Sequence, residues 1–330
     1  MPINNTGFVR FCTLWILVGF FVLVSFHASL AQGSVAPMPV GRLVDIGGLQ
    51  LHLHCIGNGS PVVIIESGNS AFSIDWALVQ PDVAKVTQVC AYDRAGYAWS
   101  ESGPANGSVE QVSDNLHLLL RSAKIRPPYI LVGASIGGLY TRAYQRRYPK
   151  EVVGLVLDDP TGEEGLKYMV NGKDTPIYEM TSADMRGAFK PLLSKPPHFD
   201  PPTQVEEPFD RLPRTLQSAH LWASQKFFAD KDIISDMIIA DSWRQEFIAQ
   251  RRQRLASAHP LGSLPLIVLG RNQNDVRLKD LKNMSALSTV GELIIAENSG
   301  HEIHLYRPDL VLQSIRKVVA AARSKTRQKQ

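Results

Sequence analysis

Short apolar runs alternate with amphipathic segments along most of the chain. Runs rich in Val, Ile and Leu occupy residues 61–66, 88–92, 129–132, 152–157, 264–269 and 291–296. Apolar residues at helical spacing occupy residues 75–84, 109–123, 138–148, 278–287 and 308–322. Strands that alternate with helices are typical of βαβ units, so this pattern predicts an α/β fold with a mostly parallel sheet.

Two parts of the chain depart from this alternation. At the start, residues 42–45 and 50–55 flank Gly47-Gly48, which is a turn signal for an antiparallel hairpin. Residues 161–262 are rich in Pro, Met and aromatic residues, with helical patterns near 218–229 and 233–255 and no long strand candidate.

The break in the alternation predicts a domain organisation. We expect an α/β core formed by residues 42–160 and 263–322. Residues 161–262 are expected to form a helical cap inserted between two strands of the sheet.

The N-terminal residues have a different character. Arg10 is the only charged residue before Arg42, and it precedes an apolar run at residues 11–26 and the small residues around Ala31. A basic flank, a short apolar run and a small-residue site predict a secretory signal peptide at residues 1–31, cleaved after Ala31. The alternative is an uncleaved membrane anchor, the one case in which we expect membrane contact. Cleavage would give a secreted or periplasmic protein, and an anchor would give a membrane-anchored protein that faces outside the cytoplasm; both place the catalytic body outside the cytoplasm.

Composition and charge exclude several classes of protein. The chain has 330 residues, of which 44% are apolar and 20% charged, as in an ordinary globular protein. Its net charge of +4 falls to +3 when Arg10 is removed with the leader, which is too weak to indicate nucleic-acid binding. The basic end at residues 323–330 is interpreted as a solvated tail.

The strongest chemical signal is the sequence GASIG at residues 133–137. A serine hydroxyl needs a base beside it and donors for the developing oxyanion. The serine turn of hydrolases requires small residues two before and two after the serine, and these are Gly133 and Gly137. An apolar strand precedes this turn and a helix follows it. We therefore predict Ser135 as the nucleophile and the amide of Ile136 as one oxyanion donor.

The other two members of a catalytic triad should lie on later loops. His301 follows the last predicted strand, where the triad order of serine, acid and histidine places the base. His304 is the competitor, although packing or contact with the cap is the simpler role for it. The acid is open between Asp275, on the loop after the strand at 264–269, and Asp159, at the end of the preceding core strand.

These residues resemble a known family. The segments 55–61, 90–97, 132–138 and 299–304 are similar to the α/β-hydrolase superfamily, and most similar to bacterial extracytoplasmic hydrolases. The resemblance covers residues 44–322 and is weakest in the cap. It implies an α/β-hydrolase fold, in which a mostly parallel eight-stranded sheet is flanked by helices and carries a helical cap insertion.

The resemblance also implies roles for individual residues. It supports Ser135 and His301, assigns the second oxyanion amide to Asn69, and favours Asp159 over Asp275 as the acid. The chain departs from many relatives at Ala134 and at Ser67-Gly68, where they have His and His-Gly, but neither departure removes a member of the triad.

The resemblance also bears on the cysteines. Removal of the leader leaves Cys55 and Cys90, which either pair in an oxidising compartment or remain buried thiols. In this fold their strands are neighbours, so the resemblance implies a Cys55–Cys90 disulfide.

The predicted function is hydrolysis of a small-molecule carboxylic ester through an acyl-enzyme, with no metal or organic cofactor. Two alternatives stay open. An aminopeptidase-like amide hydrolase would need acidic side chains for the substrate amine, for which Glu163, Glu164 and Glu302 are the candidates. The other alternative is a non-catalytic binding protein built on the same fold.

Overall fold

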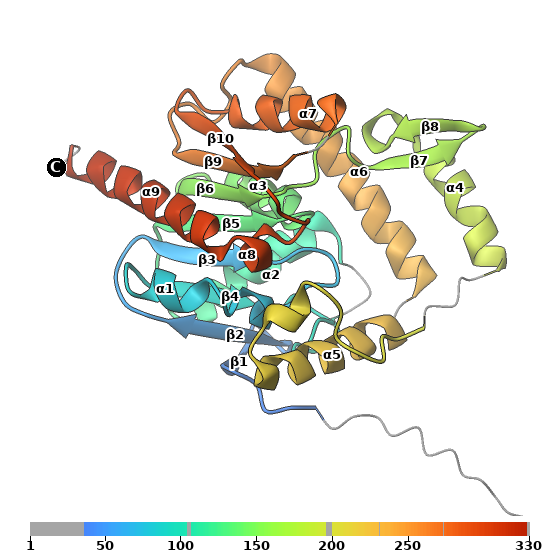
Figure 1. Cartoon of the computed structure of the whole chain (residues 1–330). Helices are drawn as coiled ribbons and strands as arrows, with labels where there is room; N and C mark the ends of the chain where they lie inside the picture. The colour runs from blue at the N-terminus through green and yellow to red at the C-terminus, as the bar shows by residue number, and fades with distance from the viewer. Residues whose placement is uncertain (1–35, 104–106, 196–199, 231, 273, 329–330) are drawn as a thin grey trace, which may run out of the picture. The chain divides into compact units, whose positions relative to one another are not determined.

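Eight strands form one sheet in the order β1-β2-β4-β3-β5-β6-β9-β10 (Figure 1). The structure is a computed structural model, and it describes residues 36–103, 107–195, 200–230, 232–272 and 274–328. The strands of the sheet are β1 (Arg42–Asp45), β2 (Gln50–Ile56), β3 (Val62–Glu66), β4 (Val89–Tyr92), β5 (Tyr129–Ala134), β6 (Val152–Asp158), β9 (Leu266–Arg271) and β10 (Gly291–Ala296).

The direction of the strands agrees with the sequence pattern. Strand β2 pairs antiparallel with both β1 and β4. All other neighbours in this sheet are parallel. The predicted eight-stranded, mostly parallel sheet is therefore confirmed.

Both faces of the sheet are covered, which explains the uninterrupted apolar runs. In β3, Ile64 packs into the core on one face, whereas Val63 and Ile65 pack into the core on the other. Leu131 and Val132 of β5 divide in the same way. Successive side chains of a strand point to opposite faces, so a strand that is covered on both sides must be apolar at every position.

Helices supply the covering layers (Figure 1). One core includes side chains from α2 (Val109–Ser122), α3 (Gly137–Arg147) and α7 (Asp275–Ser285). The core on the other face is completed by α9 (Pro308–Arg327). The short helix α1 (Gln80–Ala84) contributes Val83 to the same core.

The insertion between β6 and β9 contains more than helices. Its elements are β7 (Lys167–Val170), β8 (Lys173–Pro176), η2 (Ile177–Glu179), α4 (Ser182–Ser194), η3 (Phe209–Arg211), α5 (Arg214–Ala229) and α6 (Ile233–Ala256). Strands β7 and β8 form a small antiparallel hairpin that the sequence analysis did not predict. Asn171-Gly172 at its turn, both with positive φ, is a hairpin signal that could have revealed it.

The insertion packs on the core at two places. One apolar cluster joins Leu139 and Tyr140 of α3 to Phe189 of α4 and Phe247 of α6. A second cluster joins Phe72 and Ile74 to Ala219 and Ala223 of α5. These clusters hold the insertion over the end of the sheet that carries the predicted site.

Three segments differ from their predicted structure or lie outside the described residues. The helix predicted at 75–84 is instead two short helices, η1 (Ser73–Trp76) and α1. Helix α1 begins beside a proline, which lacks an amide donor. The basic tail predicted at 323–330 is helical as far as Arg327, and the guanidinium of Arg323 donates to the carbonyls of Ser60 and Val86. The predicted signal peptide lies outside the described residues.

The two cysteines of the core form a disulfide. Cys55 of β2 faces Cys90 of β4 across an antiparallel pair, and their sulfurs are bonded. The implied Cys55–Cys90 disulfide is thus present, and disulfides are typical of oxidising compartments. Among the helices in the described ranges, none combines the length and apolar character that a membrane span requires.

Candidate active site

Ser135 lies on a sharp turn between β5 and α3, with a positive φ of 53°. A Cβ atom at Gly133 would come within 2.6 Å of the Gly137 carbonyl oxygen. A Cβ atom at Gly137 would collide with the Glu66 carbonyl and lie 2.8 Å from that of Ser67. The two glycines of the GASIG sequence are therefore required by close backbone contacts, as the hydrolase turn demands.

The register of the sheet brings the ends of three strands together. Ala134 of β5 pairs with Asp158 of β6, and the Ser135 amide donates to the Asp158 carbonyl at 2.9 Å. Glu66 of β3 pairs with Gly133 on the other side of β5. Because these strands are parallel, the residues after each of them gather at one edge of the sheet.

The acid beside His301 is Asp159. His301 Nδ1 lies 2.6 Å from Asp159 Oδ2, and the Asp159 side chain is almost fully buried. Arg271 and Arg277 also donate to the Asp159 carboxylate, at 2.9 and 3.3 Å. Asp275, the other candidate, is the exposed first residue of α7.

The contact between His301 and Asp159 changes the pKa of both groups. The hydrogen bond to Asp159 raises the pKa of His301 above its usual value, although burial acts in the opposite direction. Burial acts to raise the pKa of Asp159, but the hydrogen bond and charge of His301 and the nearby arginines outweigh it, so this pKa is lowered. Asp159 is therefore ionised and accepts the Nδ1 proton of His301, which leaves Nε2 free to act as a base.

The Ser135 hydroxyl is half-buried and lies 3.4 Å from the Thr161 hydroxyl. Within the described residues it makes no hydrogen bond to His301. Catalytic hydrogen bonds are often long before a substrate binds. The absence of a Ser135–His301 hydrogen bond is therefore compatible with His301 acting as a base on Ser135 during the reaction.

Two backbone amides near Ser135 are available as donors. Neither the amide of Asn69 nor that of Ile136 donates a hydrogen bond to another of the described residues. Gly68, the residue before Asn69, packs closely on the serine, since a Cβ atom there would lie 3.3 Å from the Ser135 Cβ. Both predicted oxyanion donors are thus unpaired, as an anion site requires.

A cavity of about 410 Å³ lies between the core and the insertion. Asn69 is part of its wall. Most of the large side chains that line it are aromatic, and they include Tyr97, Tyr140, Tyr168, Phe189, Phe227 and Trp243. Phe227 and Trp243 belong to the insertion, in which Trp222 packs instead against Trp99 of the core.

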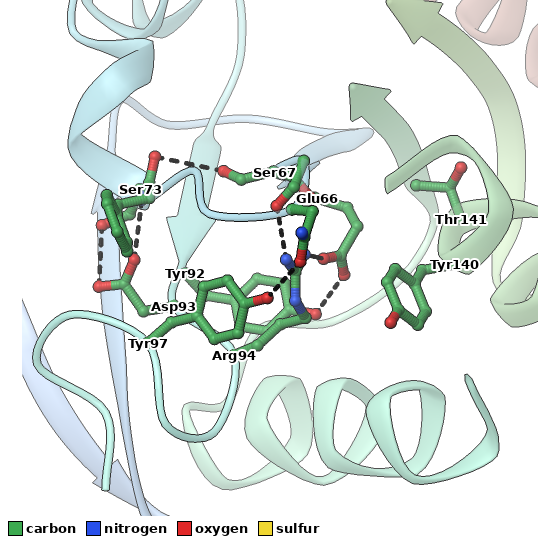
Figure 2. Close-up of polar contacts among 12 residues, drawn as sticks. Glu66, Ser67, Ser73, Tyr92, Asp93, Arg94, Tyr97, Tyr140 and Thr141 are labelled. Atoms are coloured by element: carbon green, nitrogen blue, oxygen red, sulfur yellow. Dashed lines mark hydrogen bonds and ion pairs between the residues drawn. The ribbon is translucent and has the colours of Figure 1, made fainter. Parts of the chain in front are cut away.

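Sequence reasoning missed a buried cluster below the Asn69 loop. Arg94, which follows β4, donates to Glu66 and to the carbonyls of Ser67 and Gly68 (Figure 2). The Tyr92 hydroxyl donates to the same Glu66 carboxylate. Burial raises the pKa of Glu66, while Arg94 and Tyr92 oppose that shift. The signal in the sequence was a charged residue at the end of each of two adjacent strands.

The contacts of His304 indicate a structural role. Its Nδ1 lies 2.8 Å from Asp158 Oδ2, its ring stacks on Trp76, and its side chain is buried. The residues described include no group of three or more His, Cys, Asp or Glu side chains arranged to hold a metal ion.

Comparison with known proteins identifies the family. The sequence model of the alpha/beta hydrolase family matches residues 51–314. The chain belongs to this family. It is 24% identical to the uncharacterized protein YbdG of Bacillus subtilis (strain 168), over 94% of this chain and 96% of that protein.

Other relatives of the hydrolase are matched over shorter segments. The 2-hydroxymuconate semialdehyde hydrolase of Pseudomonas sp. (strain CF600) is 31% identical, over 44% of this chain and 52% of that protein. Further curated relatives are matched over between 18% and 47% of their own length. Among solved structures, a thermophilic esterase from Thermogutta terrifontis has the same fold, with a TM-score of 0.60, 18% identity, and coverage of 85% of this chain and 98% of the esterase.

The close approach at the serine turn leads to a stability prediction. Gly137→Ala should lower the free energy of unfolding by about 1–3 kcal/mol, because its methyl group overlaps the backbone after β3. Catalytic activity should fall with it, since the overlap displaces the loop that carries Asn69. Urea unfolding followed by circular dichroism measures the first effect.

The control is Gly187→Ala in the middle of α4, where a Cβ atom meets nothing within 4 Å. Alanine is the better helix former, so this variant should be neutral or more stable by up to about 1 kcal/mol. Equal stability of Gly137→Ala and the parent protein would contradict the proposed packing of the turn.

Proposed function

We propose that the hydrolase cleaves small-molecule carboxylic esters through an acyl-enzyme formed on Ser135. The observation that carries this proposal is the 2.6 Å contact between His301 and Asp159, on loops at the same sheet edge as the Ser135 turn. In this mechanism Ser135 is the nucleophile, His301 the base, and Asp159 the acid that orients His301.

The reaction proceeds in two halves. Ser135 Oγ attacks the ester carbonyl while His301 Nε2 takes its proton, and the amides of Asn69 and Ile136 bind the resulting oxyanion. His301 then gives the proton to the departing alcohol, and an ester of Ser135 remains. Water, deprotonated by His301, attacks this ester, and the acid is released with the proton returned to Ser135.

The arginines beside Asp159 fit this role. Arg271 and Arg277 stabilise the ionised carboxylate, because opposite charges at hydrogen-bonding distance favour the charged form. Asp159 therefore remains an acceptor throughout the cycle and stabilises the imidazolium that forms when His301 takes a proton.

Two of the three glutamates considered for an amine site, Glu163 and Glu164, already have partners. Glu163 is occupied by Arg251 and Arg254, and Glu164 accepts from the Tyr178 hydroxyl. A substrate ammonium would have to compete with these contacts. This observation supports esterase activity over the aminopeptidase-like alternative, and the intact Ser135 turn and His301–Asp159 pair argue against a non-catalytic binding protein.

The cavity under the insertion suits an apolar or aromatic substituent of the ester. Its volume of about 410 Å³ falls within the range of ligand pockets. Burial of an apolar substituent against its aromatic side chains would stabilise the bound substrate. Among the similar proteins are an esterase and the hydrolase of a semialdehyde. We also propose an extracytoplasmic location, supported by the leader-like sequence and by the disulfide.

Removal of the nucleophile tests the proposal. Ser135→Ala should lower kcat for p-nitrophenyl butyrate by about 10⁴–10⁶-fold, since the covalent route is lost. The matched control is Ser194→Ala, on the exposed end of α4, which should keep full activity. Turnover by Ser135→Ala at the rate of this control would show that Ser135 is not the nucleophile.

A pair of aspartate variants tests the acid and the pH dependence. His301 must be neutral to act as a base, so activity should rise with pH through its raised pKa, above the ordinary value of about 6.5. Asp159→Asn removes the interaction that raises this pKa. It should move the acidic limb of kcat/KM to lower pH and reduce kcat by about 10³–10⁴-fold.

Asp275→Asn is the control for the second candidate acid and should change neither quantity. The measurement is the pH profile of kcat/KM between pH values of about 5 and 9, where histidine titrates. A large loss in Asp275→Asn with a normal profile in Asp159→Asn would reverse the assignment.

A further inference from the structure

The guanidinium of Arg94 holds the backbone of the loop that carries Asn69. Its Nη1 atom donates to the Ser67 carbonyl at 2.6 Å, and its Nη2 atom donates to the Gly68 carbonyl at 2.5 Å. Nη1 also donates to the Glu66 carboxylate at 2.5 Å. Arg94 is only 6% exposed, so these bonds form in a site of low dielectric constant, where they are strong.

The geometry of the peptide bond connects this contact to the oxyanion site. The Gly68 carbonyl and the Asn69 amide belong to the same planar unit, and in a trans peptide they point in opposite directions. Arg94 fixes the carbonyl end of this unit. The orientation of the Asn69 N–H is therefore fixed as well, and this N–H makes no hydrogen bond to another described residue.

The charge of Arg94 acts on the same unit. A hydrogen bond from a cation to a carbonyl oxygen polarises the peptide group, and successive hydrogen bonds strengthen one another. The Asn69 N–H thereby becomes a better donor to a negative oxygen. The benefit is largest in the transition state, because the substrate oxygen gains its charge only there.

The surroundings of Arg94 keep the guanidinium in place. It lies 4.3 Å from the ring centre of Tyr97 and 5.2 Å from that of Tyr140, and it is hydrogen-bonded to Glu66 (Figure 2). Glu66 is in turn held by the Tyr92 hydroxyl. Because Gly137 packs on the Glu66 and Ser67 carbonyls, the same segment also supports the turn that carries Ile136.

We propose that Arg94 is a positioning residue for the oxyanion hole, acting through the Gly68–Asn69 peptide unit. This inference rests on the proposed ester hydrolysis at Ser135. It assigns to the Arg94–Glu66 pair a role in transition-state binding that goes beyond stabilising the fold. A buried ion pair that served only the fold could be replaced by uncharged residues with little effect on kcat.

The test replaces both charges, so that neither is left buried without a partner. The double variant Arg94→Met/Glu66→Gln should lose about 100-fold in kcat for p-nitrophenyl butyrate, the cost of a displaced catalytic group, with KM changed by less than about threefold. Arg94→Lys should lose about 10-fold in kcat, less than the double variant, because an ammonium can still donate to one of the two carbonyls. The matched control is Arg147→Lys, a partly exposed arginine paired with Asp114.

Inhibitor affinity distinguishes positioning from a loss of folding. A trifluoromethyl ketone adds to the serine and forms an oxyanion, whereas its unfluorinated analogue occupies the pocket as a neutral ketone. In the double variant the affinity for the fluorinated ketone should fall by the same factor as kcat, and the affinity for the neutral ketone should stay constant. The acidic limb of the pH profile, set by His301, should also stay in place.

Several results would overturn the inference. A double variant and an Arg94→Lys variant that both keep kcat within about threefold of the parent would do so, as would equal losses of affinity for both ketones. If the double variant does not fold, Arg94→Lys alone decides by the same criteria. Loss of the proposed function would look different, because the parent protein would then show no Ser135-dependent turnover.

Discussion

The parallel register of β3, β5 and β6 is the constraint on which the site depends. It places the residues that follow these three strands at one edge of the sheet, where Ser135, Asp159 and the loop at residues 67–69 meet. The Ser135 amide bonds to the Asp158 carbonyl, and Gly137 packs on the backbone after β3. A shift of one residue in either strand pair would turn every side chain of the shifted strand to the opposite face and separate these groups.

Buried polar pairs reinforce this edge from below. Asp158 binds His304 and Asp159 binds His301, so two consecutive carboxylates hold the loop after β10 and the short helix Ile303–Tyr306 that follows it. On the other side, Arg94 ties β4 to the end of β3. Buried groups of this kind are costly unless they are hydrogen-bonded, and once bonded they restrict the backbone to a single arrangement. Such restriction is what catalysis through preorganised donors requires.

Much of the core could be predicted from the sequence, because its signals are local. A strand buried on both faces is apolar throughout, and the Ser135 turn needs glycine at two fixed positions. The choice between Asp159 and Asp275 was different. Both follow strands, and periodicity does not say which carboxylate reaches His301. Only the resemblance favoured Asp159, which is the residue that contacts His301 in the structure.

The remaining features depend on contacts between distant segments. The bonds of Arg94 to the carbonyls of Ser67 and Gly68 join residues that are 27 and 26 positions apart, respectively. The β7–β8 hairpin was missed because its strands have four residues each and lack an apolar alternation. The cavity is formed by side chains from both the core and the insertion, so its lining could not be read from either alone.

Covalent labelling tests the central claim most directly. A fluorophosphonate reacts with a serine only where a base and an oxyanion site activate it. Peptide mass mapping of the labelled protein should find one adduct, on the peptide that contains Ser135. An unlabelled protein, or an adduct confined to another serine, would contradict the account.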